Sequence, residues 1–213
     1  MGGAQQAGLP HEPADGARAY PVIREELEGL RRSVEFQTYR QPQASIHDGG
    51  WKTLYLYLGD MRFPRNAERC PETMRVIDAI PRRTASVMFS ALTPGTTIHP
   101  HFGPTNVKLR CHMGISGTVG CSFLVGEEER PWRDGECFVF DDSYYHAAYH
   151  RGTQTRVVLI VDVWHPDLTD DEVAAIHRLQ QFLPDDHRDL VDEEYRRAIE
   201  RGAAEDKNGW WVG

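Results

Sequence analysis

The sequence predicts a mainly β fold, built as an antiparallel sandwich or barrel and flanked by helices. From Thr84 to about Asp162, apolar and polar residues alternate with a period of two, and turn-forming residues such as Pro94-Gly95 divide the region into short runs. On both sides of this region the apolar spacing is helical. Several short strands separated by turn signals are typical of sandwiches and barrels.

The segments before the β region are expected in the following order. Residues 1–20 are rich in Gly, Ala, Pro and Gln, a composition that predicts a disordered segment. The spacing of apolar residues predicts a helix from about Val22 to Val34. TLYLYL at 53–58 alternates as a strand does, and Pro71 can open a short helix.

Five strands are expected within the β region, and two helices after it. The strand sequences are ASVMFSAL, NVKLRCHMGI, GCSFLV, ECFVF and RVVLIVDVW. Residues 169–172 match a capping box that opens a helix, and a second helix is expected from about 186 to 201. We therefore expect a single domain at 21–213, with its β core at about 51–166 and its C-terminal helices at about 169–201.

Composition excludes several classes of partner. A net charge of -8 argues against binding to nucleic acid or to an anionic membrane surface. No apolar run reaches the roughly 20 residues of a membrane span, and the first residues lack the pattern of a secretory signal. The four cysteines form no C-x-x-C pair, which argues against a zinc ribbon or a thioredoxin-type site. Their sparse, scattered positions in a chain without a signal fit reduced thiols. We expect a cytoplasmic protein with no nucleic-acid partner and no membrane association.

The expected strand at 106–115 has two chemically different faces. Lys108, Arg110 and His112 alternate with apolar residues, so they share one face. In a half-buried strand such a face meets solvent. If it lines a cavity instead, it is suited to carboxylates, because arginine offers paired donors. The sequence leaves both interpretations open.

Arg156 opens the last strand of the β region, immediately before the apolar run VVLIV. Such a run is typical of a strand that is buried on both faces. A charged side chain at its start needs a partner of opposite charge. That partner is either one of the many aspartates of the chain or an anionic ligand.

His101-Phe102-Gly103 and a later histidine resemble part of a metal-binding pattern. An H-x-D/E…H arrangement supplies three ligands on one face of Fe(II). Here Gly103 stands where the carboxylate is expected, and His146 is the best candidate for the distal histidine, with His150 as an alternative. Taken alone, H-x-G…H is weak evidence for a metal site, and two surface histidines are the better interpretation.

Together these residues resemble the aspartyl/asparaginyl β-hydroxylase family of Fe(II)- and 2-oxoglutarate-dependent dioxygenases. The motifs that carry the resemblance are PHFGPTN, LRCH, FDDSYYH and DVWHPDLT, which follow one another in the order and spacing of the family. They cover roughly residues 84–170, and WKTLYLY at 51–57 is a weaker upstream match. The family fold is a double-stranded β-helix, a cupin-like jelly roll.

The resemblance implies a metal site that contains no carboxylate ligand. His101 and His146 would hold Fe(II), and Gly103 occupies the usual carboxylate position, with water expected to fill the empty place. Asp141 and Asp142 are expected to orient this region without binding the metal. Fe(II), 2-oxoglutarate and O2 are the cofactor and cosubstrates that the resemblance implies.

The resemblance also implies a binding site for the cosubstrate. Arg156 would pair with the distal carboxylate of 2-oxoglutarate, assisted by the hydroxyl of Ser90. His112 would contact the metal-chelating end of the cosubstrate. Arg110 would bind either that end or a carboxylate of the substrate.

The implied reaction is hydroxylation of an unactivated C–H bond, with the β-carbon of an amino acid as the expected position. The substrate is expected to be a free amino acid, a peptide or an amino acid tethered to a carrier protein, with Asp and Asn as candidates. Arg110, Lys108 and Trp51 are the residues expected to contact it.

Two other functions remain open from the sequence. One is an Fe/2-oxoglutarate halogenase, because Gly103 leaves a coordination position that chloride could occupy. The other is a non-catalytic, metal-binding jelly roll. A binding protein has no need for both histidines together with Arg156 and Ser90, so their joint presence favours the hydroxylase.

Overall fold

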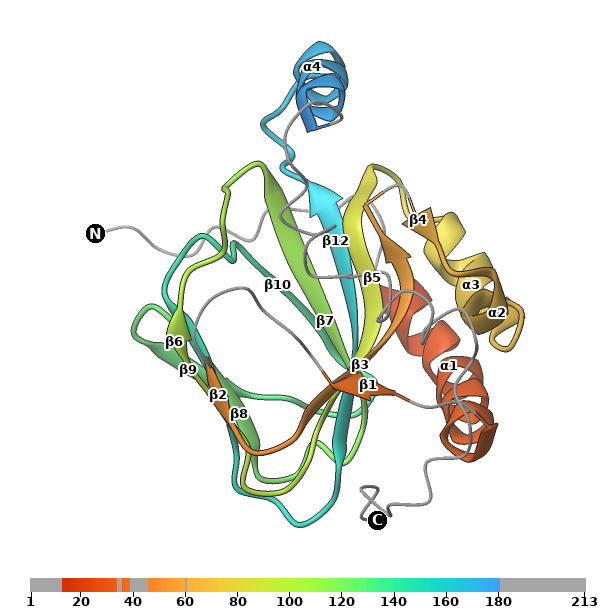
Figure 1. Cartoon of the computed structure of the whole chain (residues 1–213), viewed down its shortest axis with the longest axis vertical. Coiled ribbons are helices and arrows are strands. Elements are labelled where there is room, and N and C mark those ends of the chain that lie inside the picture. Colours follow the sequence, from red (N-terminus) through yellow and green to blue (C-terminus); the bar gives the residue numbers. More distant parts are fainter. Residues whose placement is uncertain (1–12, 34–35, 39–45, 60, 181–213) are drawn as a thin grey trace.

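A computed structural model describes residues 13–33, 36–38, 46–59 and 61–180. Within these ranges, a seven-stranded and a five-stranded antiparallel sheet face each other (Figure 1). The strands are β1 (Gln37–Thr38), β2 (His47–Asp48), β3 (Trp51–Leu58), β4 (Met61–Arg62), β5 (Arg83–Leu92), β6 (Thr97–His101), β7 (Lys108–Ser116), β8 (Cys121–Val125), β9 (Glu128–Pro131), β10 (Cys137–Phe140), β11 (His146–His150) and β12 (Arg156–Trp164). The helices are α1 (Pro13–Ser33), α2 (Pro64–Ala67), α3 (Pro71–Asp78) and α4 (Asp170–Gln180).

The strand orders confirm the predicted mainly β jelly roll. The large sheet runs β1-β3-β5-β12-β7-β10, with β4 beside β3, and the small sheet runs β2-β6-β11-β8-β9. Apart from the pairs β3–β4 and β8–β9, neighbouring strands are not consecutive in sequence, as in the double sheets of a jelly roll. All five strands expected between residues 85 and 164 form, and so does the strand expected at 53–58.

Two apolar cores hold these layers together. One lies between the two sheets and is rich in aromatic side chains, among them Phe123, Trp132 and Phe140. The other lies between the outer face of the large sheet and helices α1, α2 and α3, which Figure 1 shows on one side of that sheet. Ile23 and Leu27 of α1 are buried there.

The N-terminal helix begins earlier than the sequence predicts. Disorder is wrong for residues 13–20, which form the first turns of α1, whereas residues 1–12 lie outside the described ranges. Tertiary contacts explain the extension. Ala19 is buried in the helix-side core, and the hydroxyl of Tyr20 donates a hydrogen bond to the carbonyl of Ile115 at 3.3 Å. Pro21 therefore lies inside the helix.

The capping box before α4 forms as predicted. The backbone N–H and the hydroxyl of Thr169 both donate to the carboxylate of Glu172 at 2.8 Å, and the N–H of Glu172 donates to the Thr169 hydroxyl at 3.3 Å. The helix expected at 186–201 lies outside the described ranges. No helix within those ranges combines the length and the apolar character that crossing a membrane requires.

Candidate functional site

A cavity opens between the two sheets, and side chains from both sheets line it. Its polar lining residues are Trp51, Ser90, His101, Arg110, His112, Trp132, His146 and Arg156. Its apolar lining residues are Met88, Ile98, Phe123, Phe140, Ala148 and Ile160. A few polar groups that converge in a largely apolar pocket are typical of a small-molecule site.

Two histidines meet on the small sheet. His101 at the end of β6 lies directly opposite His146 at the start of β11, and their ring centres are 4.2 Å apart. The Nδ1 atom of His101 bonds to the carbonyl of His99 at 2.7 Å, and that of His146 bonds to the carbonyl of Tyr144 at 2.8 Å. Because a carbonyl can only accept, each Nδ1 carries the hydrogen and each Nε2 has a free lone pair.

Burial keeps both rings neutral. It lowers the pKa of His101 and lowers that of His146 to about 4, and the carbonyl hydrogen bonds oppose this effect without cancelling it. Neutral imidazole is the form that binds a metal. Two neutral rings whose Nε2 atoms are available and whose centres lie this close can share one metal ion.

Asp142 fills the space beside Gly103. The N–H of Gly103 donates to the carbonyl of Asp142 at 2.6 Å, and a Cβ at position 103 would lie 2.7 Å from the Asp142 carboxyl carbon. No larger residue fits at 103 without movement of Asp142. The Oδ1 atom of Asp142 is buried and has no hydrogen-bond partner within the described part of the chain.

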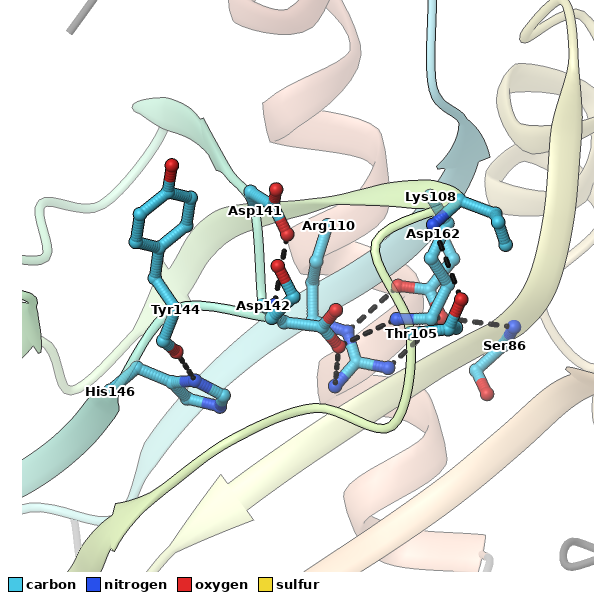
Figure 2. A network of polar contacts seen from close by, with 11 residues as sticks. Ser86, Thr105, Lys108, Arg110, Asp141, Asp142, Tyr144, His146 and Asp162 are labelled. Carbon is cyan, nitrogen blue, oxygen red and sulfur yellow. Dashed lines mark hydrogen bonds and ion pairs between the residues drawn. The ribbon is translucent and has the colours of Figure 1, made fainter. Parts of the chain in front are cut away.

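Three buried charges and the half-buried Arg110 form a network beside His146 (Figure 2). The ammonium of Lys108 lies 2.5 Å from the Asp142 carboxylate and 3.7 Å from that of Asp162. Arg110 donates to Asp162 through Nε at 2.7 Å and through Nη2 at 2.9 Å, and its Nη1 lies 3.5 Å from Asp142. Burial alone would raise the pKa of Asp162, but the charges and hydrogen bonds of Arg110, with the charge of Lys108, outweigh it and lower that pKa.

The polar face of β7 therefore points inward. Arg110 and His112 line the cavity, so the solvent-facing interpretation of this strand is wrong. Lys108 is also buried, but it lies outside the cavity lining, next to the two aspartates. Of the three residues that share this face, two reach the cavity.

Arg156 is fully enclosed and has no carboxylate partner among the described residues. Its side chain is only 2% exposed. Its Nη1 donates to the carbonyl of Ser90 at a long 3.4 Å, its Nε has no described partner, and its guanidinium carbon lies 4.5 Å from the ring centre of Trp132. Burial lowers the pKa of Arg156 to about 10. The expected alternative of an Arg–Asp pair is thus wrong, and the cation faces the cavity without a neutralising group.

His112 is enclosed by aromatic rings. Phe123, Trp132, Phe138 and Phe140 all lie with their ring centres within 6.0 Å of its own. Neither ring nitrogen has a hydrogen-bond partner within the described ranges, and burial lowers the pKa of His112 well below its usual value. The ring is therefore neutral, and its one N–H is available to an oxygen atom in the cavity.

Trp51 and Ser90 lie next to each other at the cavity wall. The indole N–H of Trp51 donates to the Ser90 hydroxyl at 3.0 Å, across the pairing of β3 with β5. Because that hydroxyl accepts from Trp51, its own hydrogen can be donated elsewhere. Ser90 also provides the carbonyl nearest to Arg156.

Two further histidines, His150 and His99, have structural partners. The Nε2 atom of His150 bonds to the carbonyl of Gln154 at 2.8 Å, and His99 pairs with Asp48 at 2.9 Å on the surface. His150 does not line the cavity, so the structure favours His146 over it. In the described ranges no group of three or more His, Cys, Asp or Glu residues is arranged to hold a metal.

Two residues of the site, Asp162 and Trp132, were not predicted from the sequence. Asp162 was hidden inside the apolar run VVLIVDVW, although an acidic residue in a buried strand was itself a signal that a buried cation must lie nearby. Trp132 follows β9 and belongs to none of the motifs, so no local signal marked it. In the fold Trp132 lines the cavity, whereas Asp162 lies outside the lining and binds Arg110, which does line it.

Comparison with known proteins gives one consistent family. The family model described as Aspartyl/Asparaginyl beta-hydroxylase matches residues 17–166. The "Aspartate beta-hydroxylase domain-containing protein 2" of Homo sapiens is 37% identical over 171 residues, which cover 75% of this chain and 46% of that protein. Its Xenopus tropicalis counterpart is 35% identical over 196 residues, with 83% and 52% covered. The chain therefore spans about half the length of these relatives.

Two further similarities are weaker. The human "Aspartyl/asparaginyl beta-hydroxylase" is 33% identical over 133 residues, which cover 60% of this chain and 18% of that protein. Among solved structures, a cupin 2 conserved barrel domain protein from Rhodopseudomonas palustris aligns with a TM-score of 0.41 and 14% identity, covering 77% of this chain and 88% of that one.

Proposed function

Because the chain belongs to the aspartyl/asparaginyl β-hydroxylase family, we propose that it is an Fe(II)- and 2-oxoglutarate-dependent dioxygenase that hydroxylates an amino acid. The expected position is the β-carbon, and the residue is free, within a peptide or tethered to a carrier protein, with Asp and Asn as candidates. Three parts of the cavity support this proposal: a histidine pair, an anion site and a fixed arginine.

The histidine pair is the proposed metal site. His101 and His146 hold the iron through their Nε2 atoms, which the carbonyl hydrogen bonds at Nδ1 leave available. When bound, iron activates O2 for attack on an unreactive C–H bond. The chain itself supplies two neutral ligands in a fixed orientation and an apolar enclosure that limits access of water.

The buried, unpaired charge of Arg156 is the observation that carries the proposal. A cation held in an apolar cavity without a carboxylate requires an anionic ligand. The distal carboxylate of 2-oxoglutarate meets that requirement, and the Ser90 hydroxyl beside it donates a second hydrogen bond. The N–H of His112 is available to the other, metal-chelating end of the same molecule.

Arg110 is the proposed contact for the substrate. Arg110 lines the cavity, and Asp162 fixes its guanidinium through Nε and Nη2, which orients the group toward a carboxylate or an amide oxygen of a substrate. Trp51 lines the same wall. Lys108 was expected to contact the substrate as well, but we assign it the role of holding the Asp142 carboxylate in place.

The surroundings of Gly103 argue against a halogenase. A chloride site in place of the missing carboxylate would need open, electrically neutral space beside this glycine. The carboxyl group of Asp142 fills that space instead, so no room is left there for a chloride ion. A purely non-catalytic binding protein would require the metal site but would leave the separate anion site unexplained.

The proposal is tested by measuring succinate formation. The Fe(II)-loaded protein is given 2-oxoglutarate and O2, with a panel of free amino acids and of Asp- or Asn-containing peptides. We expect one member of the panel to stimulate succinate formation and to gain one oxygen atom. Iron-loaded protein that forms no succinate with any substrate would point to the binding-protein alternative, and a chlorinated product would point to the halogenase.

The role of Arg156 is tested by replacing it with methionine. In Arg156→Met the affinity for 2-oxoglutarate should fall by about 2–5 kcal/mol, because one buried charged contact is lost. Arg151→Met is the matched control, since Arg151 lies in the connection that leads into β12, is exposed and pairs with Glu129 at 3.2 Å. Calorimetric titration under anaerobic conditions measures both variants. Unchanged affinity in Arg156→Met would make Arg156 a structural residue.

A further inference from the structure

Trp132 lies between two functional groups of the cavity. Its indole is buried, its ring centre is 4.5 Å from the guanidinium carbon of Arg156, and its ring is stacked on that of His112 at 6.0 Å with an angle of 19° between the planes. Its Nε1–H has no acceptor within the described part of the chain. Trp132 itself lies outside the sequence motifs that contain the other residues of the site.

We propose that Trp132 is a positioning residue that holds Arg156 by its aromatic face, in the place where a buried arginine ordinarily has a carboxylate. This inference rests on the proposed function, because it concerns the dicarboxylate that Arg156 binds. It goes beyond that function by explaining how the anion site keeps its charge when it is empty.

The two arginines of the cavity show why the identity of the partner matters. Arg110 is bound by Asp162 in a bidentate pair and also lies near Asp142, so carboxylates already compensate its charge. A carboxylate next to Arg156 would compete with the carboxylate of an incoming ligand. An aromatic face attracts a cation through its quadrupole and leaves the net charge unchanged. Trp132 therefore restrains Arg156 without neutralising it.

No other contact in the described ranges is strong enough to fix the guanidinium. The hydrogen bond from Nη1 to the carbonyl of Ser90 is 3.4 Å, longer than the usual 2.7–3.2 Å, and Nε has no described partner. A long side chain with one weak bond would sample several rotamers. Contact with the flat indole restricts it to the arrangement in which its donors face the cavity.

The test compares two ligands that differ only at the distal end. 2-Oxoglutarate has a distal carboxylate, whereas 2-oxobutyrate has the same chelating end and lacks it. Dissociation constants for both are measured by calorimetry with the Fe(II)-loaded protein under anaerobic conditions. The ratio of the two constants reports the anion site alone, because changes at the metal or in overall packing affect both ligands.

Trp132→Leu removes the aromatic face and keeps an apolar side chain. We expect the preference for 2-oxoglutarate over 2-oxobutyrate to fall about tenfold or more, with little change in the affinity for 2-oxobutyrate. In an Arg156→Met background the same substitution should cause no further loss of preference, because the two residues act together. Trp164→Leu, which removes another buried tryptophan outside the cavity lining, is the matched control and should retain the preference.

Trp132→Phe keeps an aromatic face and covers the case in which the leucine variant does not fold. It should retain the preference to within about threefold, since phenylalanine also attracts a cation. Loss of the preference in Trp132→Phe, or a full preference in Trp132→Leu, would overturn the inference while leaving the proposed function intact. A wild-type protein that binds both ligands equally would overturn the anion site itself, and the role of Trp132 with it.

Discussion

Burying the charge of Arg156 costs the fold free energy, and the proposed role of Arg156 in binding an anion accounts for this cost. A guanidinium in an apolar enclosure loses hydration, and Trp132 and one long hydrogen bond return only part of that loss. Arg156→Met should therefore leave the free energy of unfolding unchanged or raise it by up to about 2 kcal/mol. Denaturant titration without ligand measures this difference. A loss larger than about 2 kcal/mol would show that the arginine stabilises the fold.

The histidine pair gives a second prediction for single residues. His101→Ala or His146→Ala should abolish iron binding and 2-oxoglutarate turnover, because a single remaining imidazole holds the metal poorly. Iron content after dialysis and circular dichroism separate loss of the metal from loss of the fold. His99→Ala is the control on the same strand, because His99 faces the surface and pairs with Asp48. Full activity in either cavity variant would contradict the metal assignment.

Gly103 gives a third residue-level prediction. Gly103→Ala places a Cβ 2.7 Å from the carboxyl carbon of Asp142, so the variant should lose about 1–3 kcal/mol of stability and bind iron less well. Gly103→Asp should be worse, because it also brings two carboxylates together. Gly29→Ala is the control, since a Cβ there meets no atom within 4 Å. Thermal unfolding with and without Fe(II) compares the three variants, and an unaffected Gly103→Ala would mean that Asp142 is free to move.

The strands that carry His101 and His146, β6 and β11, were the hardest to predict. β7 and β12 have clear patterns, and the sequence located both correctly. β6 contains Pro100 and two histidines and is largely exposed, so it lacks the alternation that marks a strand. β11 is short and lies directly after a turn. Each becomes a strand because neighbours far away in sequence supply its hydrogen bonds.

The helix after the β region supports a prediction at the same scale. Thr169→Ala removes the reciprocal cap of α4 and should lower its stability by about 0.5–2 kcal/mol. Hydrogen exchange of the α4 amides measures the effect, and Thr169→Ser should retain most of the protection. Because α4 lies at the edge of the molecule in Figure 1, the affinity for 2-oxoglutarate should not change in either variant.

Whether a residue of the site could be predicted depended on whether its contacts are local or join segments that are distant in sequence. Local patterns placed Lys108, Arg110 and His112 on one face, and the family resemblance supplied the roles of the histidines and of Arg156. Whether that face met solvent or a cavity depended on the second sheet, which no local pattern encodes. For the same reason the pairing of Arg110 with Asp162 and the contact of Trp132 with Arg156 required the assembled fold.

At the scale of the whole molecule, the buried charge network links stability to pH. The pKa of Asp162 is lowered in the folded state, so its contribution is fully present above the unfolded-state value of about 4 and is lost as the pH falls through the folded-state value. Asp162→Asn should cost about 3–5 kcal/mol at neutral pH, because it leaves Arg110 and Lys108 without this carboxylate.

The acid dependence of unfolding tests the same residue. Below about pH 4 the wild-type protein should lose stability with a steeper slope than Asp162→Asn, which has no proton to bind at that position. Asp167→Asn is the control, because its side chain is 90% exposed. Equal slopes in wild type and Asp162→Asn would show that this carboxylate keeps an ordinary pKa in the fold.

The two sheets carry different halves of the site. His101 and His146 lie on the small sheet, whereas Ser90, His112 and Arg156 lie on the large one. The distance between the proposed metal site and the proposed anion site is therefore set by the aromatic layer that separates the sheets. Substitutions in that aromatic layer can accumulate during evolution while every polar residue of the site is kept. Each of them changes the distance between the two proposed sites. An inactive relative could thus retain the entire motif, and the cause of its inactivity would lie in its packing.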